Sequence, residues 1–132
     1  MSVTGSSLAA MTLALGMITV DALAPAPLAT WWADQLGGRI VEENDGYFVV
    51  VAVGEGTPLF AFQQVEDPTP GKNRIHLDLT TDDLESEVER LVAAGATKIA
   101  DREMPGFAWV TLADPDGNQF CVSARHEAEA TS

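Results

Sequence analysis

The sequence predicts an α+β fold in which two consecutive βαβββ modules form a pseudo-twofold, half-barrel mixed sheet with a central cavity. Two observations predict it: the same order of elements occurs twice along the chain, and equivalent residues recur at a nearly constant offset. Two apolar pairs lie 59 residues apart, and the glycines that end the two helices lie 58 apart. These pairs are Phe48 with Phe107, Val53 with Leu112, and Gly37 with Gly95. An ordered series of matches indicates an internal repeat.

The first module is expected over residues 12–65. A short apolar run predicts a strand at 13–20. Residues 25–36 predict a helix, because proline suits the first helical turn, apolar side chains follow at helical spacing, and two glycines end it. Those apolar side chains are Leu28, Trp31, Trp32 and Leu36. Further strands are predicted at 39–43, 47–53 and 59–64, with a turn at 44–46.

A connector rich in proline and glycine, residues 66–72, predicts a linker to the second module at 73–124. A strand is expected at 74–80. A helix then begins at an N-cap, Asp82 or Asp83, and runs through Ala94. The buried face expected for this helix is Leu84, Val88, Leu91 and Val92. Three more strands are predicted at 97–100, 107–112 and 119–124.

The segment 112–122 predicts a β-hairpin. Pro115 presets φ for a tight turn, and Gly117 tolerates a positive φ beside Asn118. If this hairpin joins the strand at 74–80 in one sheet, His76 and Cys121 point into a shared cavity.

The chain ends are expected to be flexible, as a leader at 1–11 and a tail at 125–132. The apolar stretch 8–20 resembles the core of a signal peptide, but no Lys or Arg precedes Arg39, so the positive n-region is missing. We therefore interpret the stretch as a buried strand.

The composition excludes several functions. The formal net charge of −13 repels phosphate backbones and anionic membrane surfaces, so neither nucleic acid nor membrane is an expected partner. The same charge either keeps the chain soluble or attracts a cationic small molecule. One cysteine excludes an intrachain disulfide and fits a reducing compartment, so a cytoplasmic location is expected.

Three segments carry a family resemblance: residues 114–118 with the strand that follows, residues 73–79, and the aromatic pair Trp31-Trp32 before 36–38. On these, the chain resembles the vicinal oxygen chelate superfamily of glyoxalase I, extradiol dioxygenases, and fosfomycin- and bleomycin-resistance proteins. It is most similar to the small glyoxalase-like branch. The resemblance covers residues 12–124 and implies a fold that hosts many chemistries.

Metal-using members of that superfamily place ligands, commonly His, Glu, His and Glu, at four symmetry-related strand positions. By resemblance the third position falls on His76 and the fourth on Cys121, and the 59-residue offset places the others on Met17 and Phe62. A thioether and a phenyl ring do not bind hard divalent ions, and strand alternation points Gln63 to the other face. Zinc accepts His and Cys but requires three or four protein ligands. We therefore expect no metal and no cofactor.

The four positions instead predict an apolar pocket for a small aromatic or cationic organic ligand. Four more side chains are expected to line it or to be plain core: Phe48, Phe107, Trp109 and Met104. His76 has three open interpretations, namely a core histidine, a hydrogen-bonding contact for the ligand, or a general base.

Two neighbours of His76 have a structural and a functional interpretation each. Asp78 lies on the same strand face, but i and i+2 side chains lie roughly 6–7 Å apart, so direct orientation of His76 is not assured. A structural role is expected for Asp78, and a pair with Arg74 or a place at the rim of the site stays open. Cys121 is expected to be inert, or an activated thiol beside His76. No Ser-His-Asp order, phosphate-binding glycine loop or CxxC motif occurs.

Three functions remain open at this stage. The first is a metal-free binding protein, like the drug-sequestering resistance members, which the resemblance implies to be dimers. The second is a metal-independent enzyme of secondary metabolism or detoxification that uses His76 as acid or base. The third is a metal-dependent lyase or dioxygenase. The expected partners are a small-molecule ligand and, in a homodimer, a second copy of the chain.

Overall fold

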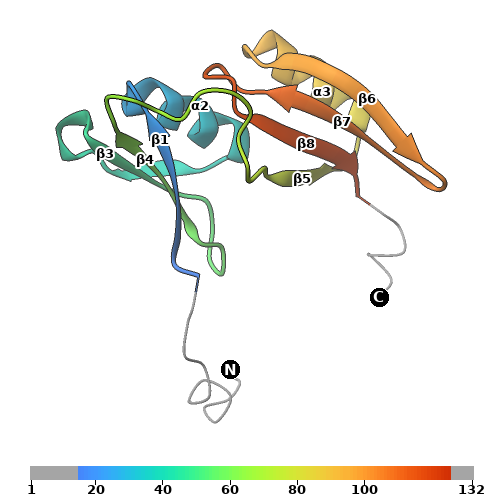
Figure 1. The fold of residues 1–132 in the computed structure, drawn as a ribbon. Helices are drawn as coiled ribbons and strands as arrows, with labels where there is room; N and C mark the ends of the chain where they lie inside the picture. The colour runs from blue at the N-terminus through green and yellow to red at the C-terminus, as the bar shows by residue number, and fades with distance from the viewer. Residues whose placement is uncertain (1–14, 126–132) are drawn as a thin grey trace, which may run out of the picture. The chain divides into compact units, whose positions relative to one another are not determined.

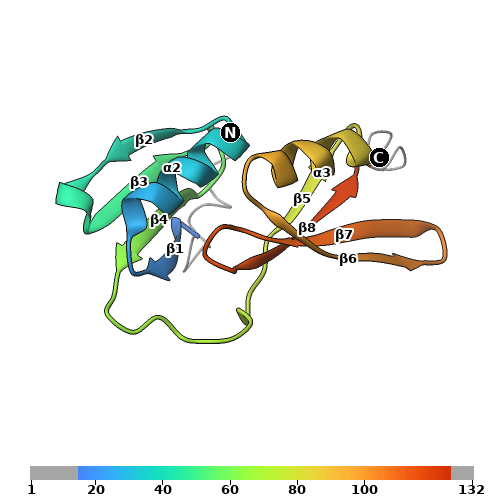
Figure 2. The ribbon, with the colours of Figure 1, turned by 90° about the horizontal axis from the view of Figure 1, so that it is seen from above.

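The computed structural model describes residues 15–125, and the chain divides into two compact units between Asp67 and Pro68. This boundary falls inside the predicted linker. We call the units module one and module two. Each is a four-stranded mixed sheet with one helix across one of its faces, as Figures 1 and 2 show. The two βαβββ modules of the predicted α+β fold are thereby confirmed, whereas the central cavity between them stays a prediction.

Module one has strand order β1-β4-β3-β2, with β1 and β4 parallel and the other pairs antiparallel. Its elements are β1 (Met17–Ala22), α2 (Pro25–Leu36), β2 (Arg39–Glu42), η1 (Asn44–Gly46), β3 (Phe48–Ala52) and β4 (Leu59–Gln64). The helix begins at Pro25 as predicted and ends at Gly37, whose φ of 67° is left-handed and therefore suits glycine. The predicted start of β1 at residues 13–14 lies outside the described residues.

Aromatic packing joins the helix of module one to its sheet. The ring of Trp32 on α2 contacts Phe60 on β4 at a centroid distance of 5.6 Å, and Phe60 contacts Phe62 at 4.7 Å. Because Phe60 and Phe62 are two residues apart on one strand, both rings lie on the sheet face that α2 covers. Edge-on aromatic contacts of this kind stabilise a core beyond the apolar area that they bury.

Module two repeats this order of elements as β5-β8-β7-β6, with β5 and β8 parallel. Its elements are β5 (Asp78–Thr81), α3 (Leu84–Ala93), β6 (Thr97–Met104), β7 (Phe107–Ala113) and β8 (Gln119–Ala124). Asp83 is the N-cap of α3, since its carboxylate accepts a hydrogen bond from the backbone N–H of Ser86 at 3.2 Å. No helix within residues 15–125 is long and apolar enough to cross a membrane.

The two faces of the module-two sheet differ in composition. Alternate side chains of β7 and β8 are buried, namely Val110, Leu112, Phe120 and Val122, and they form the core beneath α3 with Leu91. Their neighbours along the strands point to the opposite face, because the side-chain period of a strand is two. One face therefore supplies the core, and the other is available for a site.

Two strand predictions for module two are wrong in extent. The predicted strand at 74–80 begins only at Asp78, because the side chain of Asn73 takes the place of a backbone pair. Its Oδ1 accepts from the N–H of Gln119 at 2.8 Å, and its Nδ2 donates to the carbonyl of the same residue at 3.0 Å. The strand predicted at 97–100 extends to Met104, because its residues pair with β7 as far as the hairpin turn.

The predicted buried face of α3 needs one correction. Leu91 is buried, and Leu84 and Val88 are half-buried, but Val92 is 45% exposed. Successive helical residues point about 100° apart, so Val92 points away from the sheet once Leu91 points toward it.

Asp114 holds the turn between β7 and β8. It is 4% exposed, and its Oδ1 accepts hydrogen bonds from the backbone N–H groups of Asp116 and Asn118, each at 2.9 Å. The side-chain amide of Asn118 donates to the same carboxylate at 3.1 Å. The predicted turn is thus fixed by a buried carboxylate as well as by Pro115 and Gly117.

We expect Asp114→Ala to lower the free energy of unfolding by about 1–3 kcal/mol, because it removes a buried carboxylate that accepts hydrogen bonds from two backbone N–H groups of the turn. Urea denaturation at neutral pH measures the change. A loss within experimental error of zero would contradict the role of Asp114 in the turn.

Asp116→Asn is the matched control. Burial, and then the neighbouring Asp114 carboxylate, raise the pKa of Asp116, so its ionised form costs free energy in the folded state. Asp116→Asn is therefore expected to leave the free energy of unfolding unchanged, or to raise it, at neutral pH. Any difference from the native protein is expected to vanish in acid, where the Asp116 carboxyl is itself protonated.

Candidate functional site

A cavity of about 650 Å³ lies on module two, and strands β5 to β8 all contribute to its lining. Its floor is the sheet face opposite the core. The side chains that line it from the strands include Asp78, Arg102, Trp109, Thr111, Cys121 and Ser123. Lys72 and His76 line it from the segment before β5.

Strand register brings these side chains together in rows. Across β5, β8 and β7, Asp78 pairs with Cys121, and Cys121 pairs with Thr111. In the next row Ser123 pairs with Trp109, which pairs with Arg102 on β6. Residues that pair across strands point to the same face, so the polar side chains and the aromatic ring share one floor.

His76 and Asp78 are in contact in the lining of the cavity. The His76 Nε2 lies 3.3 Å from the Asp78 Oδ1, and the two side chains are 44% and 77% exposed. The strand spacing alone did not assure a direct contact between these two side chains, and His76 in fact precedes β5. The N–H of Cys121 donates to the carbonyl of Leu77 at 2.9 Å and so fixes the backbone between the two residues.

Cys121 belongs to a hydrogen-bonded chain. Its Sγ lies 3.6 Å from the hydroxyl of Thr111, which accepts a hydrogen bond from the Nε of Arg102 at 3.0 Å. Cys121 is a free thiol and half-buried. A buried threonine thus links the sulfur to a guanidinium across two strands.

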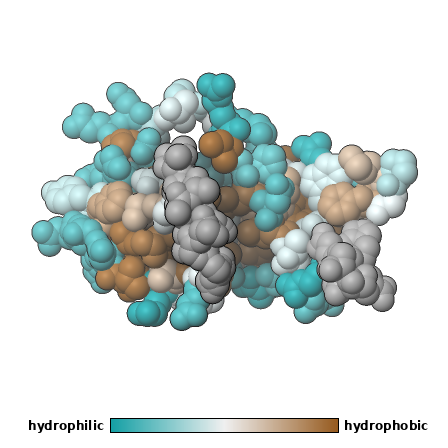
Figure 3. Space-filling model, turned by 90° about the horizontal axis from the view of Figure 1, so that it is seen from below, coloured by the Kyte–Doolittle hydropathy of each residue, from teal (hydrophilic) through white to brown (hydrophobic). Residues whose placement is uncertain are grey.

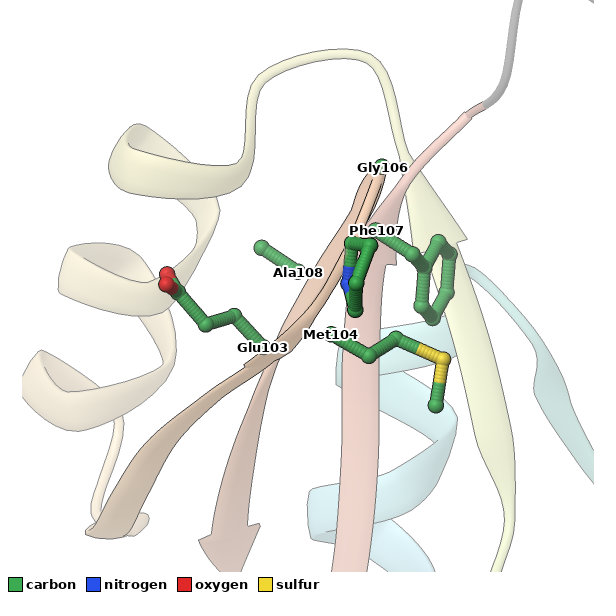
Figure 4. A pocket seen from close by; sticks show the side chains of 6 residues that line it. Glu103, Met104, Gly106, Phe107 and Ala108 are labelled. Atoms are coloured by element: carbon green, nitrogen blue, oxygen red, sulfur yellow. The ribbon is translucent and has the colours of Figure 1, made fainter.

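Aromatic rings form one wall of the cavity. Phe107 and Trp109 lie on the same face of β7, with ring centroids 5.5 Å apart and planes tilted by 32°. Met104, the cross-strand partner of Phe107, extends this wall and is 54% exposed. Figure 4 shows Met104 and Phe107 on one side of the β6–β7 hairpin and Glu103 on the other.

A second hollow of about 670 Å³ surrounds the tip of that hairpin, where Pro105 and Gly106 form the turn (Figure 4). It shares Met104 and Phe107 with the first cavity. Exposed apolar residues gather among hydrophilic ones on the face of the molecule seen in Figure 3. We interpret the tip as an extension of the aromatic wall, because Glu103 is its only titratable lining side chain among the described residues.

The cavity of module two brings together five of the residues proposed from the sequence, His76, Cys121, Met104, Phe107 and Trp109. The remaining three, Met17, Phe48 and Phe62, belong to module one. Met17 and Phe48 are half-buried at the starts of β1 and β3, and Phe62 is fully buried on the face covered by α2. The position of Phe62 is thus that of a core residue of its own module.

Sequence reasoning missed five polar lining residues: Lys72, Arg102, Thr111, Gln119 and Ser123. Arg102 lies on a part of β6 that was not predicted as strand, so the sequence did not indicate to which face of the sheet its side chain points. Thr111 could have been found, because it follows Phe107 and Trp109 at a spacing of two on β7.

The donor atoms on module two meet only part of the requirement for a metal. One atom each from His76, Asp78 and Cys121 lies within 4.8 Å of the others, and three protein ligands are the minimum for zinc. However, the His76 and Asp78 side chains are exposed and Cys121 is only half-buried, and the three offer one nitrogen, one sulfur and one carboxylate. Met17 and Phe62, at the other two family positions, supply no oxygen or nitrogen. The set does not fit the oxygen-rich site of a hard divalent ion.

Comparison with known proteins identifies the family. The sequence model of the glyoxalase-like domain matches residues 17–123, so the chain belongs to this family, and the resemblance to the vicinal oxygen chelate superfamily is confirmed. No curated protein matches.

Solved structures share the fold at low identity. A glyoxalase/bleomycin resistance protein/dioxygenase family enzyme from Burkholderia phytofirmans PsJN superimposes with a TM-score of 0.70 at 20% identity, over 85% of this chain and 98% of that one. The antibiotic binding protein TnmS3 from Streptomyces sp. CB03234 gives 0.62 at 18% identity, over 88% and 99%. The fosfomycin resistance protein FosX from Mesorhizobium loti gives 0.64 at 16% identity, over 92% and 99%.

We expect the purified protein to retain well under one equivalent of nickel, zinc, iron or manganese after dialysis, because only three donor groups converge among the described residues and none of them is buried. Elemental analysis measures the content. About one tightly held ion per chain, lost in both Asp78→Ala and Cys121→Ser, would overturn the expectation. Thr80→Ala, on the same strand as Asp78 but outside the cavity lining, is the control.

Proposed function

We propose that this protein binds a small, planar aromatic organic molecule in the cavity of module two, without a resident metal. The observation that carries the proposal is the wall formed by Phe107 and Trp109. Two rings at 5.5 Å whose planes differ by only 32° present a continuous apolar surface, on which a planar ligand can stack.

The composition of the cavity supports this function. Ligand sites combine apolar and aromatic walls with a few polar groups that fix orientation. Here the wall faces a polar floor in which Thr111 and Ser123 offer hydroxyl groups and Arg102 offers a cation. A volume of about 650 Å³ lies within the range of sites for drug-sized molecules.

The relatives support the same class of function. TnmS3 is an antibiotic binding protein, and FosX is a fosfomycin resistance protein. We extend to this chain only the common property of engaging a small organic molecule on this fold. We also propose a reducing, cytoplasmic location, in which Cys121 remains a free thiol.

Replacing Trp109 with Leu is expected to weaken the binding of fused-ring aromatic probes about tenfold, because base-like stacking on an aromatic ring contributes about 1–3 kcal/mol. Isothermal titration calorimetry with a panel of naphthalene and anthraquinone derivatives measures the dissociation constants. Ile99→Ala is the control, since Ile99 is an exposed apolar residue on β6 that lies outside the cavity lining.

Two outcomes would overturn the proposed function. One is the absence of saturable binding by every probe in the panel. The other is binding that survives unchanged in a variant in which both Phe107 and Trp109 are replaced by Leu.

The His76–Asp78 pair favours a second candidate function, a metal-independent enzyme. Because the His76 Nε2 faces the Asp78 carboxylate, the Nδ1 of the neutral imidazole is left to accept a proton from a bound molecule. Asp78 would orient the ring and stabilise the imidazolium that forms, as a carboxylate does for a catalytic histidine. The proton would move from an acidic group of the ligand to the imidazole.

For this second function we expect His76→Gln to lower the turnover of a substrate about 10²–10⁴-fold, the usual contribution of a general base. Asp78→Asn is expected to give a smaller loss and to change the pH profile of kcat/KM. Binding without turnover by both the native protein and His76→Gln would leave the protein a binder and refute the enzyme.

A further inference from the structure

We propose that the ligand of this cavity is an anion, a planar aromatic carboxylate or phenolate whose charged oxygen binds Arg102 and Lys72. This inference rests on the proposed function and specifies its ligand. The proposed ligand is negatively charged, whereas the negative net charge of the chain suggested a cationic ligand.

The charged side chains of the cavity are mostly basic. Lys72, His76 and Arg102 line it, whereas Asp78 is the only lining carboxylate among residues 15–125. The chain as a whole has 20 acidic and 7 basic residues, so a lining with two permanent cations and one carboxylate departs strongly from its surroundings. Asp78 is moreover already in contact with His76.

Neither cation of the cavity has a carboxylate partner among the described residues. Three other basic side chains of module two do have one, because Arg90 pairs with Glu87, Lys98 with Asp101, and Arg125 with Asp82. These three lie outside the cavity lining. Arg74, which lies outside the cavity lining, also has no ion pair within residues 15–125, so what sets Lys72 and Arg102 apart is that they are unpaired and line the same cavity.

Strand alternation keeps the acidic neighbours of Arg102 away from the cavity. Asp101 and Glu103 flank it on β6 and therefore point to the other face of the sheet. Figure 4 shows Glu103 on the side of the hairpin opposite Met104, which lines the cavity. The guanidinium of Arg102 therefore faces the cavity, whereas the two acidic side chains next to it on β6 point to the other face.

Arg102 is held in position next to the aromatic wall. Its Nε donates to Thr111 at 3.0 Å, which leaves the two terminal nitrogens of the guanidinium for a ligand. Arg102 is also the cross-strand partner of Trp109. A ring stacked on Trp109 and Phe107 therefore brings an acidic substituent to a guanidinium, which binds a carboxylate with two parallel hydrogen bonds.

The overall negative charge does not prevent this contact. Exposed charges are largely screened beyond a Debye length of about 8 Å at physiological ionic strength. The charges that decide the sign of the ligand are therefore those lining the cavity.

The test compares three probes that share one ring system and differ in charge: naphthoate, naphthylmethanol and naphthylmethylammonium. Calorimetry on the full chain at neutral pH and physiological ionic strength is expected to show naphthoate binding about tenfold tighter than the neutral alcohol, and the ammonium probe weakest. Arg102→Gln is expected to abolish the preference for naphthoate over the alcohol. Lys98→Gln, four residues earlier on β6 and outside the cavity, is the control and is expected to retain the preference.

A second pair of variants keeps the test decisive if Arg102→Gln does not fold. Lys72→Gln removes the other cation from a segment before β5 and is expected to reduce the preference. Arg102→Lys keeps the charge without the paired hydrogen bonds and is expected to restore part of it.

The possible outcomes separate the two proposals. Equal or tighter binding of the alcohol or the ammonium probe would overturn the anionic ligand and leave the proposed function standing. Retention of the naphthoate preference in folded Arg102→Gln and Lys72→Gln would also overturn it. If none of the three probes binds, the proposed function fails together with this inference.

Discussion

The pairing register of β6, β7 and β8 is the constraint on which the cavity depends. With Trp109 opposite Arg102 and Thr111 opposite Cys121, every second side chain faces the cavity and the intervening ones form the core. A slip of one residue would turn the core of module two toward solvent and bury its polar floor. The fully buried Leu112 and the nearly fully buried Phe120 oppose such a slip, so the packing that stabilises the module also positions its site.

The edge of the cavity depends on Asn73, whose side chain makes hydrogen bonds that a paired backbone residue would otherwise make. Asn73 pairs with both backbone groups of Gln119, and its Nδ2 also donates to the carbonyl of Ile75 at 2.7 Å. Residues 74–77, between Asn73 and β5, are therefore not part of a strand, although hydrogen bonds hold this segment to β8 at both ends. His76 lies in that short span, outside the strand, with its Nε2 3.3 Å from the Asp78 carboxylate.

Much of the fold could be predicted from the sequence, because local signals determine it. Proline and glycine bound α2, and apolar runs between turns locate β4 and β8, so these three elements have their predicted limits. The site was predictable only in part. His76, Cys121, Phe107 and Trp109 could be assigned to a pocket, but the position of His76 outside β5 depends on the Asn73 pair. The position of Arg102 depends on how far β6 continues. Both are properties of tertiary hydrogen bonding, which the pattern of apolar residues does not encode.

The long strand β6 has a consequence beyond ligand binding. It is the last strand of its sheet and almost entirely exposed, so one row of its amide and carbonyl groups has no partner strand within module two. Such an edge is a template on which other chains can add and grow into fibrils. Here Lys98, Asp101, Arg102 and Glu103 place charge of both signs along it, which makes the addition of a further strand costly. These charged side chains on β6 therefore oppose aggregation of the chain through its sheet edge at high concentration.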